Sequence, residues 1–333
     1  MCLSPITLKE NLAGRVYERR VPCGHCLECL KKRQSSYVVR TIEAVRSYGS
    51  MWFVTLTYND DKCPCTELGH NTLRRKDLQN WKKHFKKFIS SQNFAWLLCG
   101  EYGPKTHRPH YHGCIIGLSD SDVMIAEKSW SDYYGFTCFK KVPTISCDGS
   151  DDVANVARYI SKYIVKPDNM RVPFEDCEMP RVMSSIGYGL PKDFKDYKNL
   201  RDYMLAFDKF DYDPYDIKTI NSQIVDTVIG RLKYQYRGFH YSVPMYIIKK
   251  FLYEKDYSGS LRPSALSRLV SATLRIKSEV GTDKAFRKLE ADSINGENSE
   301  AFAAFQNSQE NMLLSRYQSA EKNFKRVYQK SKF

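Results

Sequence analysis

Two histidines at alternate positions, His110 and His112, are the residues of this chain whose type and spacing best suit chemistry. Side chains at alternate positions of a β-strand share a face, so the two imidazoles would lie side by side while Tyr111 faces the core. Such a pair can bind one divalent cation, although two unrelated strand histidines would show the same spacing. A metal site therefore needs a third ligand.

A carboxylate, Glu101, lies near the end of the preceding apolar segment, residues 95–102. The turn-forming sequence GPKTHRP separates this segment from the histidines and predicts a β-hairpin, in which Glu101 can lie across from them. Two histidines and a carboxylate leave positions open for a phosphate oxygen, which suits Mg²⁺ or Mn²⁺ as a Lewis acid and also suits zinc. The alternative is an ion pair between Glu101 and Arg108.

A second group lies in a predicted helix over residues 151–166, where Tyr159 and Tyr163 are four positions apart and Lys162 and Lys166 flank them. Positions i and i+4 of a helix are neighbours, so the two phenols would lie together beside the apolar face. A phenol can attack a phosphodiester once a cation assists its deprotonation. Half-buried tyrosines with solvated lysines would have the same spacing, so the helix alone does not decide between these interpretations.

Cysteines cluster near the N-terminus, at Cys23, Cys26 and Cys29, with Cys2 upstream. Three cysteines at C-x₂-C-x₂-C need a fourth ligand to complete a tetrahedral zinc site, for which Cys2 is the candidate and His25 the alternative. The spacing is also similar to iron–sulfur runs, but their usual following cysteine and proline are missing. Reduced cysteines without metal are the third interpretation.

These groups would be positioned by short strands that alternate with amphipathic helices. Hydrophobic periodicity predicts strands at 51–58, 95–102, 110–118 and 136–145, and helices at 36–48, 73–90, 122–130 and 151–166. This order predicts an α+β fold in which helices pack against an antiparallel sheet. Further helices are expected at 264–281 and 298–328, whereas residues 1–35 read as a loop.

The composition favours a polyanionic partner and a reducing compartment. The formal net charge is +14, from 52 basic and 38 acidic residues, and lysines and arginines displace counterions from phosphate backbones. The start of the chain does not read as a signal peptide, and no apolar stretch approaches the roughly 20 residues of a membrane helix. We therefore expect a cytoplasmic protein without a membrane partner, whose clustered cysteines bind metal rather than form disulfides.

Three motifs together resemble those of the HUH superfamily of rolling-circle replication initiators. The His-Tyr-His triplet at 110–112 looks like the HUH motif, with tyrosine in place of the usual aliphatic residue. FVTLTY at 53–58 resembles the strand motif that precedes it, and ARYISKY at 157–163 resembles the two-tyrosine helix that follows. The motifs occur in the family's order, and the resemblance covers about residues 1–167.

Within this superfamily, the chain is most similar to the initiators of Microviridae, the small single-stranded DNA bacteriophages, in their gokushovirus branch. The segments that carry this similarity are VPCGHCLEC at 21–29, CGEYG at 99–103 and RPHYHG at 108–113. The resemblance implies an RRM/ferredoxin-like HUH domain over residues 36–170. A cysteine-rich, zinc-binding segment (1–35) would precede it, and an accessory region, mostly helical (171–333), would follow.

The resemblance also implies a mechanism. Tyr159 or Tyr163 would nick origin single-stranded DNA in a sequence-specific reaction and remain linked to its 5′ end. The freed 3′ hydroxyl would prime the host polymerase, and the second tyrosine would complete strand transfer and ligation. Lys162 would stabilise charge on the phenolate or the phosphate. Because no G-x-x-x-x-G-K-[ST] loop occurs in the sequence, a host helicase in the bacterial cytoplasm is the expected source of unwinding.

The resemblance implies a role for the remaining residues as well. Glu101, His110 and His112 would bind Mg²⁺ or Mn²⁺, Arg108 and Lys166 would contact DNA, and a cysteine near the N-terminus favours Cys2 as the fourth zinc ligand. Two other functions stay open. One is a relaxase- or transposase-like HUH nuclease, and the other is a non-catalytic, zinc-containing nucleic-acid-binding protein whose tyrosines only pack.

Overall fold

The computed structural model shows a mixed α+β protein whose chain divides into two compact units. One unit comprises Arg33–Arg201 and Lys233–Phe251, and the other comprises Met1–Lys32, Asp202–Leu232 and Leu252–Phe333. Within these bounds, the structure describes residues 6–12, 15–24, 27–143, 152–164, 172–190, 220, 222–236, 239–264 and 267–274.

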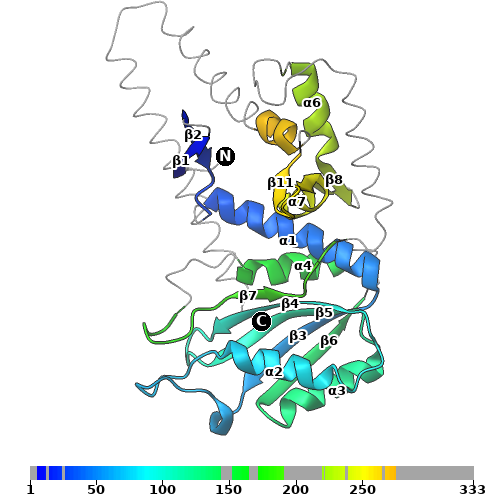
Figure 1. Cartoon of the computed structure of the whole chain (residues 1–333). Coiled ribbons are helices and arrows are strands. Elements are labelled where there is room, and N and C mark those ends of the chain that lie inside the picture. Colours follow the sequence, from blue (N-terminus) through cyan, green and yellow to red (C-terminus); the bar gives the residue numbers. More distant parts are fainter. Residues whose placement is uncertain are drawn as a thin grey trace, which may run out of the picture. The chain divides into compact units, whose positions relative to one another are not determined.

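The first unit is built on a five-stranded sheet with strand order β6-β3-β5-β4-β7, in which every pair is antiparallel (Figure 1). Its strands are β3 (Met51–Tyr58), β4 (Ala95–Tyr102), β5 (Pro109–Ile116), β6 (Gly135–Val142) and β7 (Val182–Ser184). The predicted antiparallel sheet packed by helices is therefore confirmed. The edge strand β7 was not predicted, because its three residues lie in a proline-rich segment without alternation.

Helices lie on both sides of this sheet (Figure 1). On one side are α2 (Arg75–Phe85) and α3 (Asp120–Ser131), and on the other are α1 (Leu27–Tyr48) and α4 (Asp152–Ile164). The four predicted helices are present, but two bounds differ. The chain leaves the α2 helix after Phe85 and forms a turn, whereas α1 begins nine residues earlier than expected, at Leu27 instead of residue 36.

The side of the sheet under α2 and α3 holds an aromatic core. Its largest buried side chains include Tyr58, Trp81, Tyr111 and Trp130. The indole N–H groups of both tryptophans donate to backbone carbonyls, so this core leaves neither donor unsatisfied. Tyr111 is 1% exposed, which confirms that it points into the core and turns its two histidine neighbours to the opposite face.

Gly113 allows β5 to lie close against β4. A Cβ atom at this position would come within 1.9 Å of the carbonyl oxygen of Leu97, and backbone atoms cannot yield to such a clash. A glycine directly after His112 is therefore required for the two strands to pair in this register.

The N-terminal residues and the part after residue 220 add smaller elements. β1 (Ile6–Leu12) and β2 (Arg15–Val21) form a hairpin, so the loop expected over residues 1–35 is wrong where the structure describes it. Later residues form α6 (Ser222–Arg231), α7 (Met245–Leu252) and the strand pairs β8 (Lys233–Tyr236) with β9 (Phe239–Ser242), and β10 (Tyr253–Lys255) with β11 (Leu261–Pro263).

Of the two helices expected near the C-terminus, residues 267–274 of the first are helical, and 298–328 lies outside the described residues. None of the helices that the structure describes combines the length and apolar character needed to cross a membrane.

We predict that Asp122, in the first turn of α3, is a main polar anchor of this unit. Its carboxylate accepts the backbone N–H groups of Ser90 (2.8 Å) and Ser91 (2.9 Å). Asp122→Ala should lower the free energy of unfolding by about 1–3 kcal/mol, because both donors lose their acceptor. Chemical denaturation measures this loss. The control is Asp120→Ala in the same helical turn, where the carboxylate is 72% exposed; its effect should stay below about 0.5 kcal/mol.

The same anchor predicts a pH dependence. Burial acts to raise the pKa of Asp122, but hydrogen bonds from Ser91, Ser90 and Ser119 outweigh it and hold the pKa at about 2. A folded pKa below the unfolded value of about 3.9 stabilises the fold fully above roughly pH 4, and this contribution is lost as the pH falls towards 2. The gap between wild type and Asp122→Ala should therefore close in that window, and a constant gap would contradict the assignment.

Candidate metal centre

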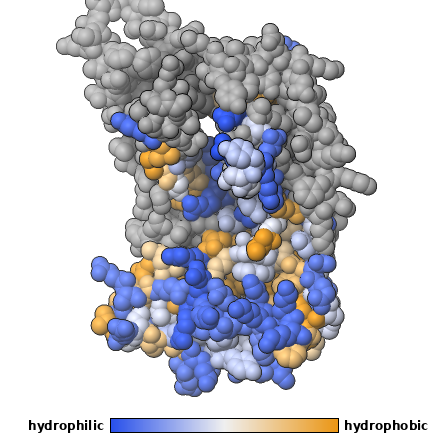
Figure 2. All heavy atoms as spheres, in the orientation of Figure 1, coloured by the Kyte–Doolittle hydropathy of each residue, from blue (hydrophilic) through white to orange (hydrophobic). Residues whose placement is uncertain are grey.

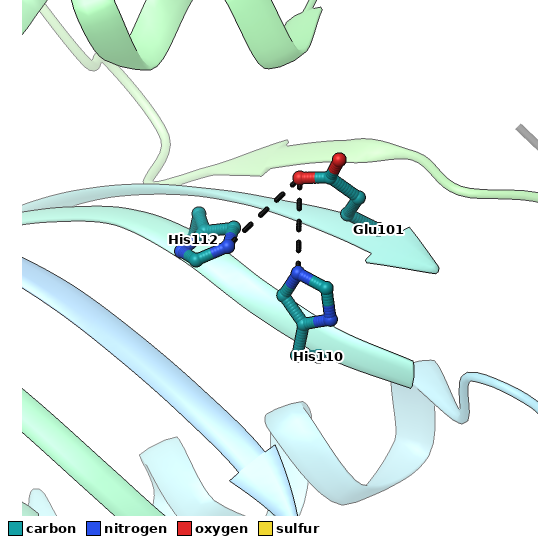
Figure 3. Close-up of side chains that lie close together, drawn as sticks. All are labelled: Glu101, His110 and His112. Carbon is teal, nitrogen blue, oxygen red and sulfur yellow. Dashed lines mark ion pairs between the residues drawn. The ribbon is translucent and has the colours of Figure 1, made fainter. Parts of the chain in front are cut away.

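Three side chains from neighbouring strands converge on the face of the sheet opposite the aromatic core. Glu101 comes from β4 and both histidines from β5, and the cross-strand register places Glu101 directly opposite His110 (Figure 3). The Oε2 atom of Glu101 lies 3.7 Å from Nε2 of His110 and 3.9 Å from Nε2 of His112. All three ligand atoms lie within 4.8 Å of one another, so this group can hold a metal ion.

Partners on the far side of each imidazole orient the rings. The Nδ1–H group of His110 donates to the carbonyl oxygen of Arg108 (2.9 Å), which leaves the lone pair on Nε2, the atom that faces Glu101. Nδ1 of His112 is hydrogen-bonded to Oγ1 of Thr55 on β3 (3.0 Å). Outer partners of this kind fix the tautomer and orientation of metal-binding histidines.

Burial keeps both histidines in the form that binds metal. Each histidine side chain is 16% exposed and that of Glu101 is 11% exposed. Burial lowers the pKa of His110, which its hydrogen bond to the Arg108 carbonyl only partly counteracts. Burial, together with the nearby His110, lowers the pKa of His112 to about 3. At neutral pH, two uncharged imidazole nitrogens and a carboxylate oxygen therefore face one point, which is a donor set suited to a divalent cation.

Arg108 takes another direction than the alternative ion pair with Glu101. Its guanidinium contacts the carboxylate of Asp60 and lies 3.5 Å from the carbonyl oxygen of Tyr58. It holds the loop that follows β3 at the end of the sheet where the metal-binding group lies. With 36% of its side chain exposed, Arg108 also presents charge to solvent beside the group.

Of the two predicted nucleophiles, Tyr159 has a described side chain, and it lies next to the metal-binding group. Its ring packs edge-on against Phe53 of β3 with centroids 5.7 Å apart, and Phe53 in turn stacks on His112 at 6.1 Å. One aromatic ring thus separates Tyr159 from a metal ligand. Tyr163 and Lys162 belong to α4, but their side chains, like Lys166, lie outside the described residues.

The predicted zinc cluster is described only in part. Cys23 is partly exposed ahead of α1, and Cys29 is buried within that helix. Cys2, Cys26 and the alternative ligand His25 lie outside the described residues. The zinc site therefore stays a prediction.

Sequence reasoning did not single out Phe53 and Thr55. Both lie in FVTLTY and share the strand face that carries the histidines, so alternation could have marked them as candidates. The pairing of Thr55 with His112 depends on the register between β3 and β5, which no local pattern reveals.

We expect His110→Ala and His112→Ala each to lower the affinity for Mn²⁺ by at least about 100-fold, because each removes one of three ligands. Wild-type protein should gain thermal stability as Mn²⁺ is added, and the variants should not. The matched control is His240→Ala, which removes an exposed histidine on β9. A normal Mn²⁺ titration in either ligand variant would refute the site.

A separate prediction concerns the orientation of His112. Thr55→Val removes the hydroxyl bonded to Nδ1 with little change in volume, and should weaken Mn²⁺ binding by roughly 10-fold. Thr57→Val is the control, because Thr57 pairs with His110 along the same strand without a side-chain hydrogen bond to it among the described residues. Isothermal titration calorimetry of both variants measures the difference, and equal affinities would exclude the proposed support.

Comparison with known proteins gives this geometry a context. Residues 51–168 match the family model of the phage replication-associated protein ORF2. The replication-associated protein ORF2 of Spiroplasma virus 4 is 30% identical over 121 residues, which are 35% of this chain and 38% of that protein. Replication-associated protein ORF4 of Chlamydia phage 1 is 30% identical over 100 residues, 29% of this chain and 24% of the relative.

A third relative, replication-associated protein VP4 of Bdellovibrio phage phiMH2K, is 25% identical over 140 residues, 37% of this chain and 43% of the relative. The chain thus covers less than half the length of each of these relatives. No solved structure gives a significant match. The segment that carries the metal-binding group and Tyr159, residues 51–168, therefore belongs to the replication-associated protein ORF2 family, in agreement with its resemblance to Microviridae-type replication initiators.

Proposed function

We propose that this protein is a rolling-circle replication initiator that nicks single-stranded DNA at an origin, with tyrosine as the nucleophile. The observation that carries the proposal is the position of Tyr159, one aromatic ring away from the His112 side of a buried Glu-His-His group. The match to replication-associated proteins of phages gives this arrangement its biological setting.

In this proposal, Glu101, His110 and His112 hold a divalent cation, Mg²⁺ or Mn²⁺. When bound, the cation supplies Lewis-acid stabilisation of charge on the scissile phosphate. The three side chains occupy one side of the position and leave the other side for oxygen atoms of the substrate. The buried, neutral imidazoles add no positive charge of their own, so the histidines orient the phosphate only through the ion that they bind.

The reaction exchanges one phosphodiester for another. The phenolic oxygen of a tyrosine forms a bond to phosphorus as the bond to the 3′ oxygen breaks. The phenol proton is lost, and the departing 3′ oxygen gains a proton. The product is a 5′-phosphotyrosine link, which conserves the bond energy, so a later attack by a free 3′ hydroxyl restores the DNA and frees the tyrosine. A phenol has a pKa near 10, so it needs a cation close by, and Lys162 is the proposed side chain that stabilises its anion.

Tyr159 and Tyr163 would alternate, because one helical turn of about 5.4 Å separates them and one phosphate can serve both. Arg108 and Lys166 would contact the DNA backbone, and Cys2, Cys23, Cys26 and Cys29 would hold a structural zinc ion. The partners would be origin single-stranded DNA and the host helicase and polymerase in the bacterial cytoplasm. The net charge of +14 supports the polyanionic partner.

The test is covalent trapping on origin oligonucleotides. Tyr159→Phe and Tyr163→Phe should each retain nicking at reduced rate and lose completion of strand transfer, because no free nucleophile remains after the first attack. The double variant should form no adduct. Phenylalanine keeps the ring and removes only the hydroxyl, so folding should be unaffected. Mass spectrometry should place DNA on Tyr163 in the first variant and on Tyr159 in the second.

Tyr257→Phe is the control, since this tyrosine is fully exposed in the turn between β10 and β11. A protein–DNA adduct that persists in the double variant would refute tyrosine nucleophilic attack at this helix. If all adduct maps to one tyrosine and loss of the other leaves strand transfer at the wild-type rate, the alternating mechanism is wrong. Absence of cleavage with intact Mn²⁺ binding would favour a role in DNA binding alone.

A further inference from the structure

A second candidate site lies on the α2 side of the sheet, away from the metal-binding group. A cavity of about 390 Å³ lies between α2 and the strand edge formed by β4 and β7. Arg75 and Lys82 of α2 line it, together with Trp96 and Leu98 of β4 and Met183 of β7. This volume falls in the range of small-ligand pockets and would accommodate one mononucleotide.

The position of Lys82 distinguishes it from the other lysines near the end of α2. Lys83, Lys86 and Lys87 are exposed, whereas Lys82 is half-buried, with its Nζ atom 4.4 Å from the centroid of the Trp96 ring. Burial lowers the pKa of Lys82, and the nearby charges of Lys86 and Lys83 lower it further. An anion in the cavity would relieve both effects, which exposed lysines on a solvated helix face would not need.

The positive charge in this cavity is not balanced locally. Among the residues that the structure describes, no carboxylate lies within 4.0 Å of the side-chain nitrogens of Lys82 or Arg75. The carboxylate of Glu178 instead bonds the backbone N–H of Arg75, at 3.2 Å. In Figure 2, the face that carries α2 and α3 is largely hydrophilic, so the cavity opens within a polar surface.

Trp96 adds an aromatic surface and an available donor. The indole N–H groups of the other three tryptophans donate to backbone carbonyls; these are Trp52 to Leu118 at 3.3 Å, Trp81 to Ala126 at 2.9 Å and Trp130 to Thr57 at 3.2 Å. That of Trp96 has no acceptor in the described part of the chain, and the residue is partly exposed. A partly exposed indole between two cations is a surface on which a base can stack and form a hydrogen bond.

We propose that this cavity binds one nucleotide of single-stranded DNA outside the metal centre, with the phosphate on Lys82 and Arg75 and the base against Trp96. The inference rests on the proposed function in taking DNA as the ligand. Trp96 and Glu101 lie on opposite faces of β4, so the bound nucleotide would be separate from the scissile phosphate. The site would anchor a flanking stretch of the strand and carry no part of the chemistry.

The test is a fluorescence-anisotropy titration of labelled oligothymidylate against the full chain in EDTA at about 0.1 M salt. EDTA prevents cleavage, so the outcome is independent of whether the protein nicks DNA. Lys82→Gln and Trp96→Leu should each weaken binding by about 5- to 10-fold, and Lys82→Gln should reduce the salt dependence by about one ion. Lys83→Gln is the matched control, because it removes the same charge from the adjacent, exposed position and should cost less than about 2-fold.

Circular dichroism and thermal melts check that each variant is folded. Equal losses in Lys82→Gln and Lys83→Gln would overturn the proposal, because they would show a general charge effect without a site. Unchanged binding in Trp96→Leu would overturn it as well. Free thymidine monophosphate tests the source of the nucleotide: it should compete only weakly, and an affinity equal to that of the oligonucleotide would overturn the assignment to DNA.

Discussion

The register between β4 and β5 is the constraint on which the candidate site depends. It places Glu101 opposite His110, and a shift of one residue would move the carboxylate to the aromatic core and both histidines with respect to it. Two features fix it. Tyr111 is buried under α2 and α3, and Gly113 allows β5 to approach the Leu97 carbonyl. The two sides of the sheet are thus coupled, because the side that packs the core sets which side chains face the other way.

This coupling explains how a polar group can be stable with little exposed surface. The histidines lose hydration, which lowers their pKa values, and each recovers a hydrogen bond through Nδ1, one to a backbone carbonyl and one to a threonine of the next strand. The ring nitrogens that face Glu101 keep their lone pairs for a ligand. Rigid strands supply all three side chains, so little conformational freedom remains to be lost when an ion binds.

Much of the sheet was predictable because its signals are local. Residues 51–58 and 95–102 alternate apolar and polar or small side chains and form strands with those bounds, and GPKTHRP fixes the hairpin that joins Glu101 to the histidines. The contacts of Thr55 and Phe53 were not predictable, because they depend on pairing between strands about 60 residues apart in the chain. β7 was missed for a related reason, since its three residues form a strand only through the edge of β4. The start of α1 at Leu27 was hidden by a cysteine-rich sequence that resembles a metal-binding loop.

The place of β7 in the chain has a consequence for how this protein can be divided. Residues 51–168 include every ligand of the candidate metal centre, but β7 begins at Val182, beyond that segment. Without it, the backbone groups of Leu97, Leu98 and Cys99 would lose their partners and β4 would become an open edge. An open, apolar strand edge is a template for pairing with a second chain. The segment defined by ancestry is therefore smaller than the unit that can remain monomeric, and the residues after α4 act as a covering strand as well as a connection.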